Sequence, residues 1–528
     1  MEKKQSFLSG AAILGAAVAI TKVLGAIYKI PLGNLLDSDG MAHFYVAYNV
    51  YSLLLILSTA GLPLALSRLV AEAGARNRVN QQKRIFRTAL VLLAAIGLLC
   101  AGAMWCFPER IALLLRDSRA AESIRVLAPA VLCVCISSAL RGYTQGQGSM
   151  TPTAVSQVVE STGKLAVGLG LAWILLQHGA APQRAAAGAI AGVSAGAVLS
   201  LAVLVIFLLL RRRPAGTDLP QSRGEILRQL LLIGVPITVG AAGMNLITLL
   251  DQTLVLSTLQ NHLGCGEAEA TVLYGQYTFG MTLFNLPSSF IYPGSISLMP
   301  ALSAALVRRD RAAVRQQTAT ALRLTALLAL PAGVGLSVLA EPILHLLYPA
   351  VPETAVAAAY HLRILGIACI FVCLMVVTGG ILQACGKPYI PMVTLLCGGA
   401  LKIAVNYWLV ADPAVGIRGA AVGTLCCYGL IAVLNAIAVH RVLPEKPDYL
   451  RLFGPTAAAA AVMALAAWGI YRLLGGGRMA TVLAIAGAVI VYAAAAVLLG
   501  AVTREDVENL PILSKIAKKL PVQRKKLH

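Results

Sequence analysis

Charged residues are scarce in this chain of 528 residues. They make up 12% of it, against roughly 25% in soluble proteins. Hydrophobic residues account for 58%, and the mean hydropathy is +0.80. A soluble globule of this length could not bury so much apolar surface, and a disordered chain would contain far less of it. The composition therefore excludes both classes.

Paired cysteines are also missing. The 11 cysteines include no CxxC pair, and nearly all lie in or at the ends of apolar runs. This pattern excludes a secreted disulfide scaffold and indicates thiols that pack as small hydrophobes. We expect neither a metal site nor a cofactor.

Sequence motifs of catalysis are absent as well. The Gly-Lys pairs at 163–164 and 386–387 are followed by Leu165 and Pro388, so neither is a Walker A site and ATP is not the direct energy source. The seven histidines are scattered, and the external loops are short. We predict that the protein is not an enzyme. The first apolar run continues to about Leu36 without a convincing cleavage site, which indicates a retained helix rather than a signal peptide.

Long apolar runs dominate the chain, and a bilayer core needs about 20 such residues per helix. The sequence therefore predicts an all-α polytopic membrane protein with about fourteen transmembrane helices. Their approximate spans are 7–32, 42–70, 87–107, 122–145, 152–177, 186–210, 228–258, 271–304, 316–340, 355–384, 389–410, 418–440, 452–474 and 479–502.

The two halves of the chain resemble each other. Gly142, Gln145, Gly148 and Lys164 recur 238 residues later. Each repeat holds six spans, an even number, so both repeats enter the membrane in the same orientation and form a parallel repeat. We predict an N-terminal lobe at 1–226, a C-terminal lobe at 227–443, two added helices at 444–502 and a basic tail at 503–528. A ligand site is expected between the lobes.

Basic residues are distributed unevenly between the loops. Of the 43 lysines and arginines, 29 fall on one side of the predicted topology and eight on the other. The positive-inside rule then places both termini of this multi-pass membrane protein in the cytoplasm. The net charge of +21 thus comes mainly from the loops and tail, where basic residues set the topology and attract anionic lipids. No nucleic-acid partner is expected.

A few charges remain inside the spans, and each is unfavourable there unless it faces a cavity or a partner. Six are basic and two acidic, a bias that favours an anionic ligand. Lys22 and Lys29 are seven residues apart on one helix face, although Lys29 has the alternative of snorkelling to the interface. The eight residues are Lys22, Lys29, Glu160, Lys164, Asp251, Arg323, Arg363 and Lys402.

Other embedded residues have structural alternatives. Glu160 and Lys164 have the i, i+4 spacing of a salt bridge. Lys402 is the repeat equivalent of Lys164 and has Asn406 at i+4, so both are candidate cavity residues. Candidates for a structural or coupling role are Asp251, Asn49 and Arg68. Glycines at 188, 192 and 196 form a small-residue stripe that predicts close helix packing.

Several stretches together resemble a known family. They are the runs at 22–32, 48–52, 58–72 and 157–160, Lys164, Leu286-Pro287 with Tyr292-Pro293, and Lys402 with Asn406. The chain resembles stage V sporulation protein B-type polysaccharide exporters of the multidrug/oligosaccharidyl-lipid/polysaccharide exporter (MOP) superfamily, and is similar to MurJ-type lipid II flippases. It departs from the MurJ branch at Thr282, where that branch has an arginine.

The resemblance implies an alternating-access flippase with a cationic cavity. Its substrate would be an undecaprenyl-pyrophosphate-linked sugar, such as lipid II or another cell-wall precursor, with Lys22, Lys164 and Lys402 near the pyrophosphate. Cell-wall synthesis proteins are candidate partners. A cation-coupled multidrug antiporter is the main alternative, and a non-transporting scaffold in cell-wall assembly or sporulation is a third hypothesis. The antiporter would need an embedded acid in the first lobe, and only Glu160 is available there.

Overall fold

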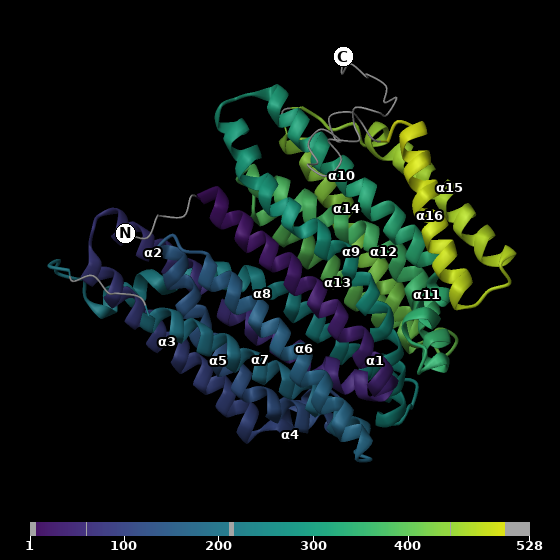
Figure 1. Ribbon diagram of the computed structural model, residues 1–528, viewed down its shortest axis with the longest axis horizontal. Coiled ribbons are helices and arrows are strands. Elements are labelled where there is room, and N and C mark those ends of the chain that lie inside the picture. The colour runs from purple at the N-terminus through teal and green to yellow at the C-terminus, as the bar shows by residue number, and fades with distance from the viewer. Residues whose placement is uncertain (1–6, 60, 211–215, 444, 502–528) are drawn as a thin grey trace. The chain divides into compact units, whose positions relative to one another are not determined.

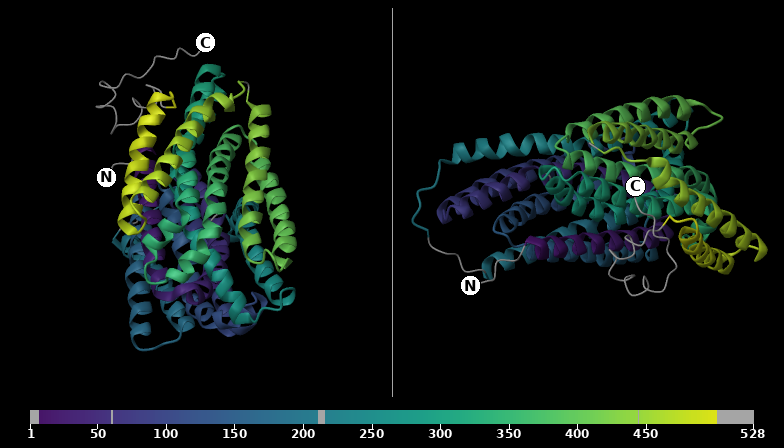
Figure 2. Two further views of the ribbon diagram at one scale, coloured as in Figure 1. Left: turned by 90° about the vertical axis from the view of Figure 1, so that its right-hand side faces the viewer. Right: turned by 90° about the horizontal axis from the view of Figure 1, so that it is seen from above.

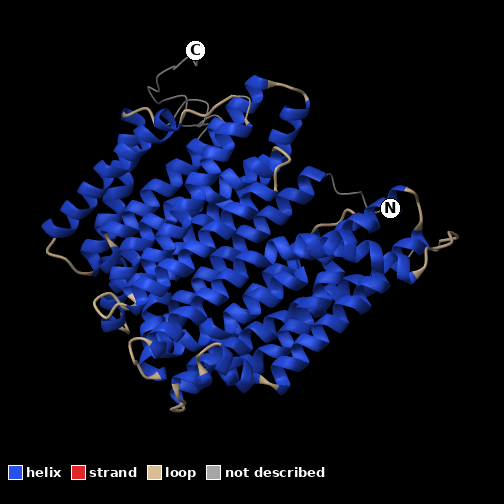
Figure 3. Ribbon diagram, turned by 180° about the vertical axis from the view of Figure 1, so that it is seen from behind, coloured by secondary structure: helices blue, strands red, loops and turns tan. Residues whose placement is uncertain are grey.

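Helices form nearly all of the described structure (Figure 3). The computed structural model describes residues 7–59, 61–210, 216–443 and 445–501, and no strand occurs in these ranges. Eleven stretches within them are long and apolar enough to cross a membrane, the first of which, Ile13–Ala75, joins two helices. The prediction of an all-α polytopic membrane protein is confirmed. The predicted basic tail at 503–528 lies outside the described residues.

The chain divides into two compact units, Met1–Thr278 and Phe279–His528. Helix α9 begins in the first unit and ends in the second. The lobe boundary predicted at 226/227 came from the sequence repeat, and it stays a prediction. Up to and including α9 the helices, whose α-helices Figure 1 labels, are α1 (Phe7–Thr59), α2 (Gly61–Ala75), α3 (Val79–Cys106), α4 (Pro108–Leu114), the 3-10 helix η1 (Ser118–Ala120), α5 (Ala121–Gly146), α6 (Thr151–Gln177), α7 (Pro182–Leu210), α8 (Arg223–Asn261) and α9 (Glu267–Val307).

Helix α1 bends back on itself at Asp37, whose φ of 54° and ψ of −167° are not helical. The Tyr28 ring in its first half lies 5.9 Å from the Phe44 ring in its second half. A straight helix would separate these residues by about 24 Å. The chain therefore reverses between the first two predicted spans, 7–32 and 42–70, through a sharp bend at Asp37 rather than an open loop, and the second span continues into α2.

Small residues let α6 and α7 approach closely. A Cβ atom on Gly192 would collide with the Cα and N atoms of Gly168, and one on Gly196 would collide with the Glu160 carbonyl. A Cβ atom on Gly188 would lie 2.6 Å from a methyl group of Leu175. The small-residue stripe predicted from the sequence is confirmed as a helix-packing surface.

The sequence repeat is visible in the structure as two turns with the same hydrogen bonds. After α5, the N–H of Gly148 donates to Gln145 at 2.9 Å and that of Ser149 donates to Thr144 at 3.0 Å. The same two bonds recur 238 residues later in the second unit. There the N–H of Gly386 donates to the Gln383 carbonyl and the N–H of Lys387 donates to the Leu382 carbonyl, both at 3.0 Å. Gly148 and Gly386 have φ values of 79° and 72°, which favour glycine. The turns end equivalent helices in the same way.

A segment before α8 is fixed to the start of α3. The Asp218 carboxylate accepts hydrogen bonds from the backbone N–H groups of Asn80 at 2.7 Å and Gln81 at 2.8 Å. Arg78, which precedes α3, makes no side-chain cap, so Asp218 caps the helix from a distant part of the chain. Gln81 and Gln221 add two reciprocal hydrogen bonds of 2.7 Å. We call this arrangement the α3 clasp.

The second unit continues with helical hairpins. Figure 2 shows α15 and α16 in yellow as an antiparallel pair, packed through Ala467, Ala484 and Ala488 with Met463 and Leu339. Small side chains at this contact let the two helix backbones approach. The helices of the unit after α9 are α10 (Arg311–Val338), α11 (Ala340–Leu347), α12 (Pro352–Ala384), α13 (Tyr389–Ala411), α14 (Arg418–Val442), α15 (Tyr449–Leu473) and α16 (Arg478–Leu498).

Candidate functional site

The bend of α1 brings a lysine against aromatic rings. The Lys29 Nζ atom lies 4.6 Å from the centroid of the Tyr45 ring and 5.4 Å from that of Tyr48. An ammonium within about 6 Å of a ring is attracted by its electron-rich face. Lys29 therefore does not snorkel to the interface. Its side chain turns inward and contacts the second half of its own helix.

A second lysine reaches the same tyrosine from α6. The Lys164 Nζ atom donates a hydrogen bond of 3.2 Å to the Tyr48 hydroxyl, and it lies 4.3 Å from the centroid of that ring. It also lies 5.0 Å from the centroid of the Tyr28 ring. We call Lys29, Lys164, Tyr28, Tyr45 and Tyr48 the lysine–tyrosine cluster. Its two ammonium groups share Tyr48.

Helix packing fixes the cluster in place. The Tyr28 hydroxyl donates a hydrogen bond of 2.9 Å to the carbonyl of Ala189 on α7. A Cβ atom on Gly168 would meet that hydroxyl at 2.9 Å, so glycine makes room for the ring. The Tyr48 ring stacks on Phe44 with centroids 5.5 Å apart. Tight contact among α1, α6 and α7 therefore orients both lysines.

The expected salt bridge between Glu160 and Lys164 does not form. Glu160 pairs instead with Arg141 of α5 at 2.7 Å. Arg141 also donates to Ser156 at 2.9 Å and to Ser200 at 2.8 Å. Its side chain is 12% exposed and that of Glu160 is 22% exposed. The prediction failed because a guanidinium on a neighbouring helix offers the carboxylate a better-oriented donor than an ammonium one turn away.

This pairing changes the charge balance of the cluster. Glu160 neutralises Arg141, which the sequence prediction had counted among the loop residues, and leaves both lysines without a carboxylate. Within the ranges that the structure describes, neither Lys29 nor Lys164 forms an ion pair. Two ammonium groups held by aromatic faces and a hydroxyl have the charge that suits an anion, and each retains N–H donors for a ligand.

The remaining candidates of the first unit lie apart from the cluster contacts. Lys22 is exposed, about 10 Å along α1 from Lys29. Arg68 forms an exposed pair with Glu72 at 2.8 Å. The Asn49 amide donates to the Gln252 side chain of α8, which connects α1 with α8. Asp251, next to Gln252, is 4% exposed.

The candidates Lys402 and Asn406 belong to the second unit. They lie on α13 and are 7% and 1% exposed. A Cβ atom on Gly423 of α14 would collide with the Asn406 amide oxygen, so glycine makes room for this side chain too. In the same unit, Arg363 pairs with Glu341 at 3.1 Å.

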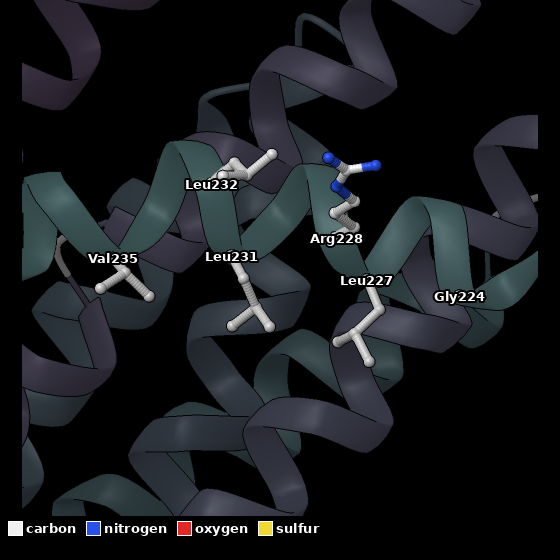
Figure 4. A pocket seen from close by; sticks show the side chains of 6 residues that line it. All are labelled: Gly224, Leu227, Arg228, Leu231, Leu232 and Val235. Atoms are coloured by element: carbon white, nitrogen blue, oxygen red, sulfur yellow. The ribbon is translucent and has the colours of Figure 1, made fainter.

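A groove beside α8 offers a different surface. It has a volume of about 530 Å³ and is lined by one face of the helix. Figure 4 shows that face, which is apolar except for Arg228 near its start. None of its residues belongs to the lysine–tyrosine cluster. Its lining residues are Gly224, Leu227, Arg228, Leu231, Leu232 and Val235.

Sequence reasoning missed the aromatic half of the site and the role of Arg141. The prediction used charge alone, and Tyr28, Tyr45 and Tyr48 carry none. Their signal was present as three tyrosines on either side of the bend at Asp37. Arg141 lies inside the predicted span at 122–145, which could have placed it in the bundle.

Known proteins resemble this chain over most of its length. The family described as polysaccharide biosynthesis protein matches residues 7–306, and the family described as MatE matches 272–408. Three relatives come from Bacillus subtilis (strain 168). An uncharacterized membrane protein, YabM, is 30% identical over 98% of this chain and 97% of its own. Stage V sporulation protein B is 28% identical over 84% and 85%. The lipid II flippase MurJ is 24% identical over 81% and 82%.

Solved structures share the fold. A lipid II flippase MurJ in an inward closed conformation aligns with a TM-score of 0.70 over 92% of this chain and 98% of its own, at 12% identity. A multidrug resistance MATE transporter of the MOP superfamily, inward-facing, aligns with a TM-score of 0.64 over 80% and 98%, at 14% identity. The sequence matches and the shared fold identify a multi-pass membrane transporter. The chain belongs to the polysaccharide biosynthesis protein family of the MOP superfamily.

Proposed function

We propose that the protein is a flippase that moves a lipid-linked sugar carrying a pyrophosphate from the cytoplasmic to the outer leaflet. The single observation that carries the proposal is the lysine–tyrosine cluster, in which Lys29 and Lys164 approach Tyr48 with no acidic partner among the described residues. A pyrophosphate presents several oxygen acceptors and about two negative charges, which match two ammonium groups. The relatives named as a lipid II flippase and stage V sporulation protein B support this substrate class.

The transport cycle would exchange access between the two sides of the bacterial plasma membrane, with both termini in the cytoplasm. Lys22 would guide the pyrophosphate toward the cluster, since it lies on the same helix two turns before Lys29. Lys402 and Asn406 would contribute less, because they are almost fully buried here. Lipid II or another cell-wall precursor is the substrate, and cell-wall synthesis proteins are the partners that would supply or use it.

The energy source in this proposal is the membrane potential. Two negative charges that move outward across about 100 mV gain about 4–5 kcal/mol, enough to bias the direction of transport. Basic loops would meanwhile bind the anionic lipids of the cytoplasmic leaflet. The protein performs no bond-forming step in this scheme, so it is a transporter rather than an enzyme.

The test is a flipping assay with purified protein in vesicles. A fluorescent undecaprenyl-pyrophosphate-linked sugar is placed in one leaflet, and its arrival in the other is followed by quenching. Vesicles with the protein should flip it, and an imposed potential should change the rate. Lys22→Arg should retain more activity than Lys22→Ala, because only the arginine keeps the charge. Equal activity of these two variants would contradict the hypothesis that Lys22 contacts the phosphate.

A cation-coupled multidrug antiporter is the second candidate, favoured by the match of residues 272–408 to the MatE family. Such a protein needs an acid that exchanges a cation. Glu160 is the embedded acid nearest the cluster in sequence, and it already pairs with Arg141. The same vesicles distinguish the two: export of a cationic dye under a sodium or proton gradient, with no flipping of the lipid-linked sugar, would favour the antiporter.

A further inference from the structure

Four charged residues meet beside the bend of α1. The His43 Nδ1 atom lies 2.6 Å from a carboxylate oxygen of Asp117, and its Nε2 atom lies 3.5 Å from one of Asp39. Arg119 donates to Asp39 at 2.9 Å. The side chains of His43 and Asp117 are 0% exposed. We call these four residues the His43 network, and it is separate from the lysine–tyrosine cluster.

The geometry matches a protonated imidazole. Both ring nitrogens of His43 face carboxylate oxygens, and only the imidazolium has a proton on each. A neutral ring would direct a lone pair at Asp39 or at Asp117. The protonated ring also balances charge, since two carboxylates then face one imidazolium and one guanidinium. Without that proton the network would carry a net negative charge next to a fully buried carboxylate, which is unfavourable.

Two buried polar atoms of the network have no hydrogen-bond partner. They are the second carboxylate oxygen of Asp117 and the Nε2 atom of His43, whose distance to Asp39 exceeds that of a hydrogen bond with good geometry. A small approach of Asp39 would complete the second bond of the imidazolium. The network thus holds one titratable proton between His43 and Asp117, whose side chains water does not reach.

The segment that carries Asp117 connects several helices. The backbone N–H and the hydroxyl of Ser118 both donate to Glu267 at the start of α9, at 2.5 Å. The Gln260 amide, near the end of α8, donates to the Arg116 carbonyl at 2.8 Å. Through these bonds residues 116–119 connect the bend of α1 to the end of α8 and the start of α9. The predicted topology places this end of the unit outside the cell.

The bend itself is strained. Asp37 has a positive φ although it is not glycine, and such a conformation persists where surrounding contacts stabilise it. Gly275 of α9 packs on this bend, where a Cβ atom would collide with the Ser38 carbonyl. The His43 network begins only two residues after Asp37. It is therefore the charged contact best placed to hold the bend closed.

Other charges at this end belong to separate pairs. Glu109 lies 3.5 Å from Arg125, and Glu122 lies 4.0 Å from Arg184, with all four side chains about half exposed or more. Arg110 lies over the Phe107 ring. Across the described ranges, the charged groups in contact with His43 are Asp39 from α1 itself and Asp117 from the segment before η1.

We propose that the His43 network is a proton-binding site whose protonated form closes this end of the first unit, and whose deprotonation loosens residues 116–119 from α1. The site itself is independent of the substrate; only its link to the transport cycle rests on the proposed function. Loss of the proton would leave Asp39 and Asp117 to repel each other across a neutral ring. Acidic pH outside the cell would then favour the closed form, and higher pH would favour opening.

Two native cysteines report on this opening. Cys265 is half-buried in the loop between α8 and α9, two residues before Glu267, and burial raises the pKa of its thiol. Cys106 at the end of α3 is exposed. The full-length protein in lipid nanodiscs is treated with a small maleimide, and labelling of each cysteine is measured by peptide mass spectrometry. The ratio of Cys265 to Cys106 labelling corrects for the general rise of thiol reactivity with pH.

The ratio should rise about fivefold or more between about pH 6 and pH 9, a typical size for coupled equilibria. In His43→Gln and in Asp117→Asn this fivefold rise should be lost, because neither variant retains the charged pair, and only the smaller pH dependence that comes from the ionisation of the two thiols should remain. His178→Gln, at an exposed histidine after α6, should behave like the unmodified protein. If His43→Gln aggregates, Asp117→Asn provides the test, because an amide keeps the shape of the carboxylate.

Two outcomes overturn the proposal: a ratio that does not change with pH in the unmodified protein, or an unchanged pH profile in both variants. Failure of the flippase proposal is separate. In that case the lipid-linked sugar is not flipped at any pH, while the labelling ratio still follows the protonation of His43.

Discussion

Lys164 and Lys402 occupy equivalent positions in the two repeats, but their surroundings differ. Lys164 contacts the rings of Tyr48 and Tyr28 in the first unit. Lys402 is 7% exposed and lies one turn from the buried Asn406 in the second. The repeat therefore supplies a lysine twice, whereas the aromatic residues come from the bent α1. The bend of α1 thus gives Lys164 its contacts with Tyr28 and Tyr48.

The largest difference is expected when each lysine is neutralised in turn. Lys164→Gln should slow flipping of a lipid-linked sugar by about tenfold to a hundredfold, since one charged hydrogen bond is worth about 1.5–3 kcal/mol. Lys402→Gln should change the rate by less than about threefold, a difference near 0.6 kcal/mol. Initial flipping rates in vesicles measure both. An equal loss in the two variants would show that the repeats contribute alike.

Glycine contacts sharpen the same comparison. Gly192→Ala should destabilise the protein by about 1–3 kcal/mol, because its Cβ atom meets backbone atoms of Gly168 that cannot move alone. Gly423→Ala, on α14 of the second unit, meets the Asn406 side chain, which can rotate. Its effect should be smaller. Thermal unfolding in detergent tests this order, with Gly429→Ala as control because open space surrounds that position.

The ion pair of the first unit should have a moderate effect. Glu160→Gln removes the charge that balances Arg141, and we expect a loss of about 1–2 kcal/mol, since both groups keep some exposure. Flipping should continue in the variant that folds, because Glu160 neutralises Arg141 rather than a lysine of the cluster. Complete loss of transport with unchanged thermal stability would instead indicate a coupling role for this acid.

The smallest effect is expected at the α3 clasp. Partial desolvation would raise the pKa of Asp218, but the backbone N–H groups of Asn80 and Gln81 outweigh it, and the pKa lies below its ordinary value. A lowered pKa means that the contribution to stability is present above the ordinary range near pH 4 and is lost as the pH falls through the lowered value.

Asp218→Ala should therefore speed hydrogen exchange of the Asn80 and Gln81 amides at neutral pH, and the difference from the unmodified protein should vanish in acid. Asp448→Ala removes a carboxylate cap of α15 in the second unit and is the matched control. If both variants speed exchange at Asn80 and Gln81, the effect is general destabilisation and the clasp is not its source.

The fold was largely predictable because span length and apolar composition suffice to define membrane helices. Within the described residues the predicted spans lie almost entirely on helices, and the glycine stripe on α7 was recognised from its spacing. The bend at Asp37 was not, because a single residue with positive φ leaves no mark on hydropathy.

Contacts between residues far apart in the chain could not be predicted from the sequence. Glu160 has a lysine one turn away along α6, yet its partner Arg141 lies 19 residues away, brought there by the turn at Gly148. The contact of His43 with Asp117 spans 74 residues. Local spacing predicts which pairs are within reach, whereas the crossing of helices decides which of them form.

The most direct test of the account is binding of a prenyl pyrophosphate to purified protein in nanodiscs, titrated by calorimetry. The unmodified protein should bind it, Lys29→Gln/Lys164→Gln should weaken binding by about a hundredfold, or near 2.8 kcal/mol, and Arg68→Gln should match the unmodified protein. Unchanged affinity in the double variant, with the protein still folded, would contradict the claim that the lysine–tyrosine cluster binds the pyrophosphate.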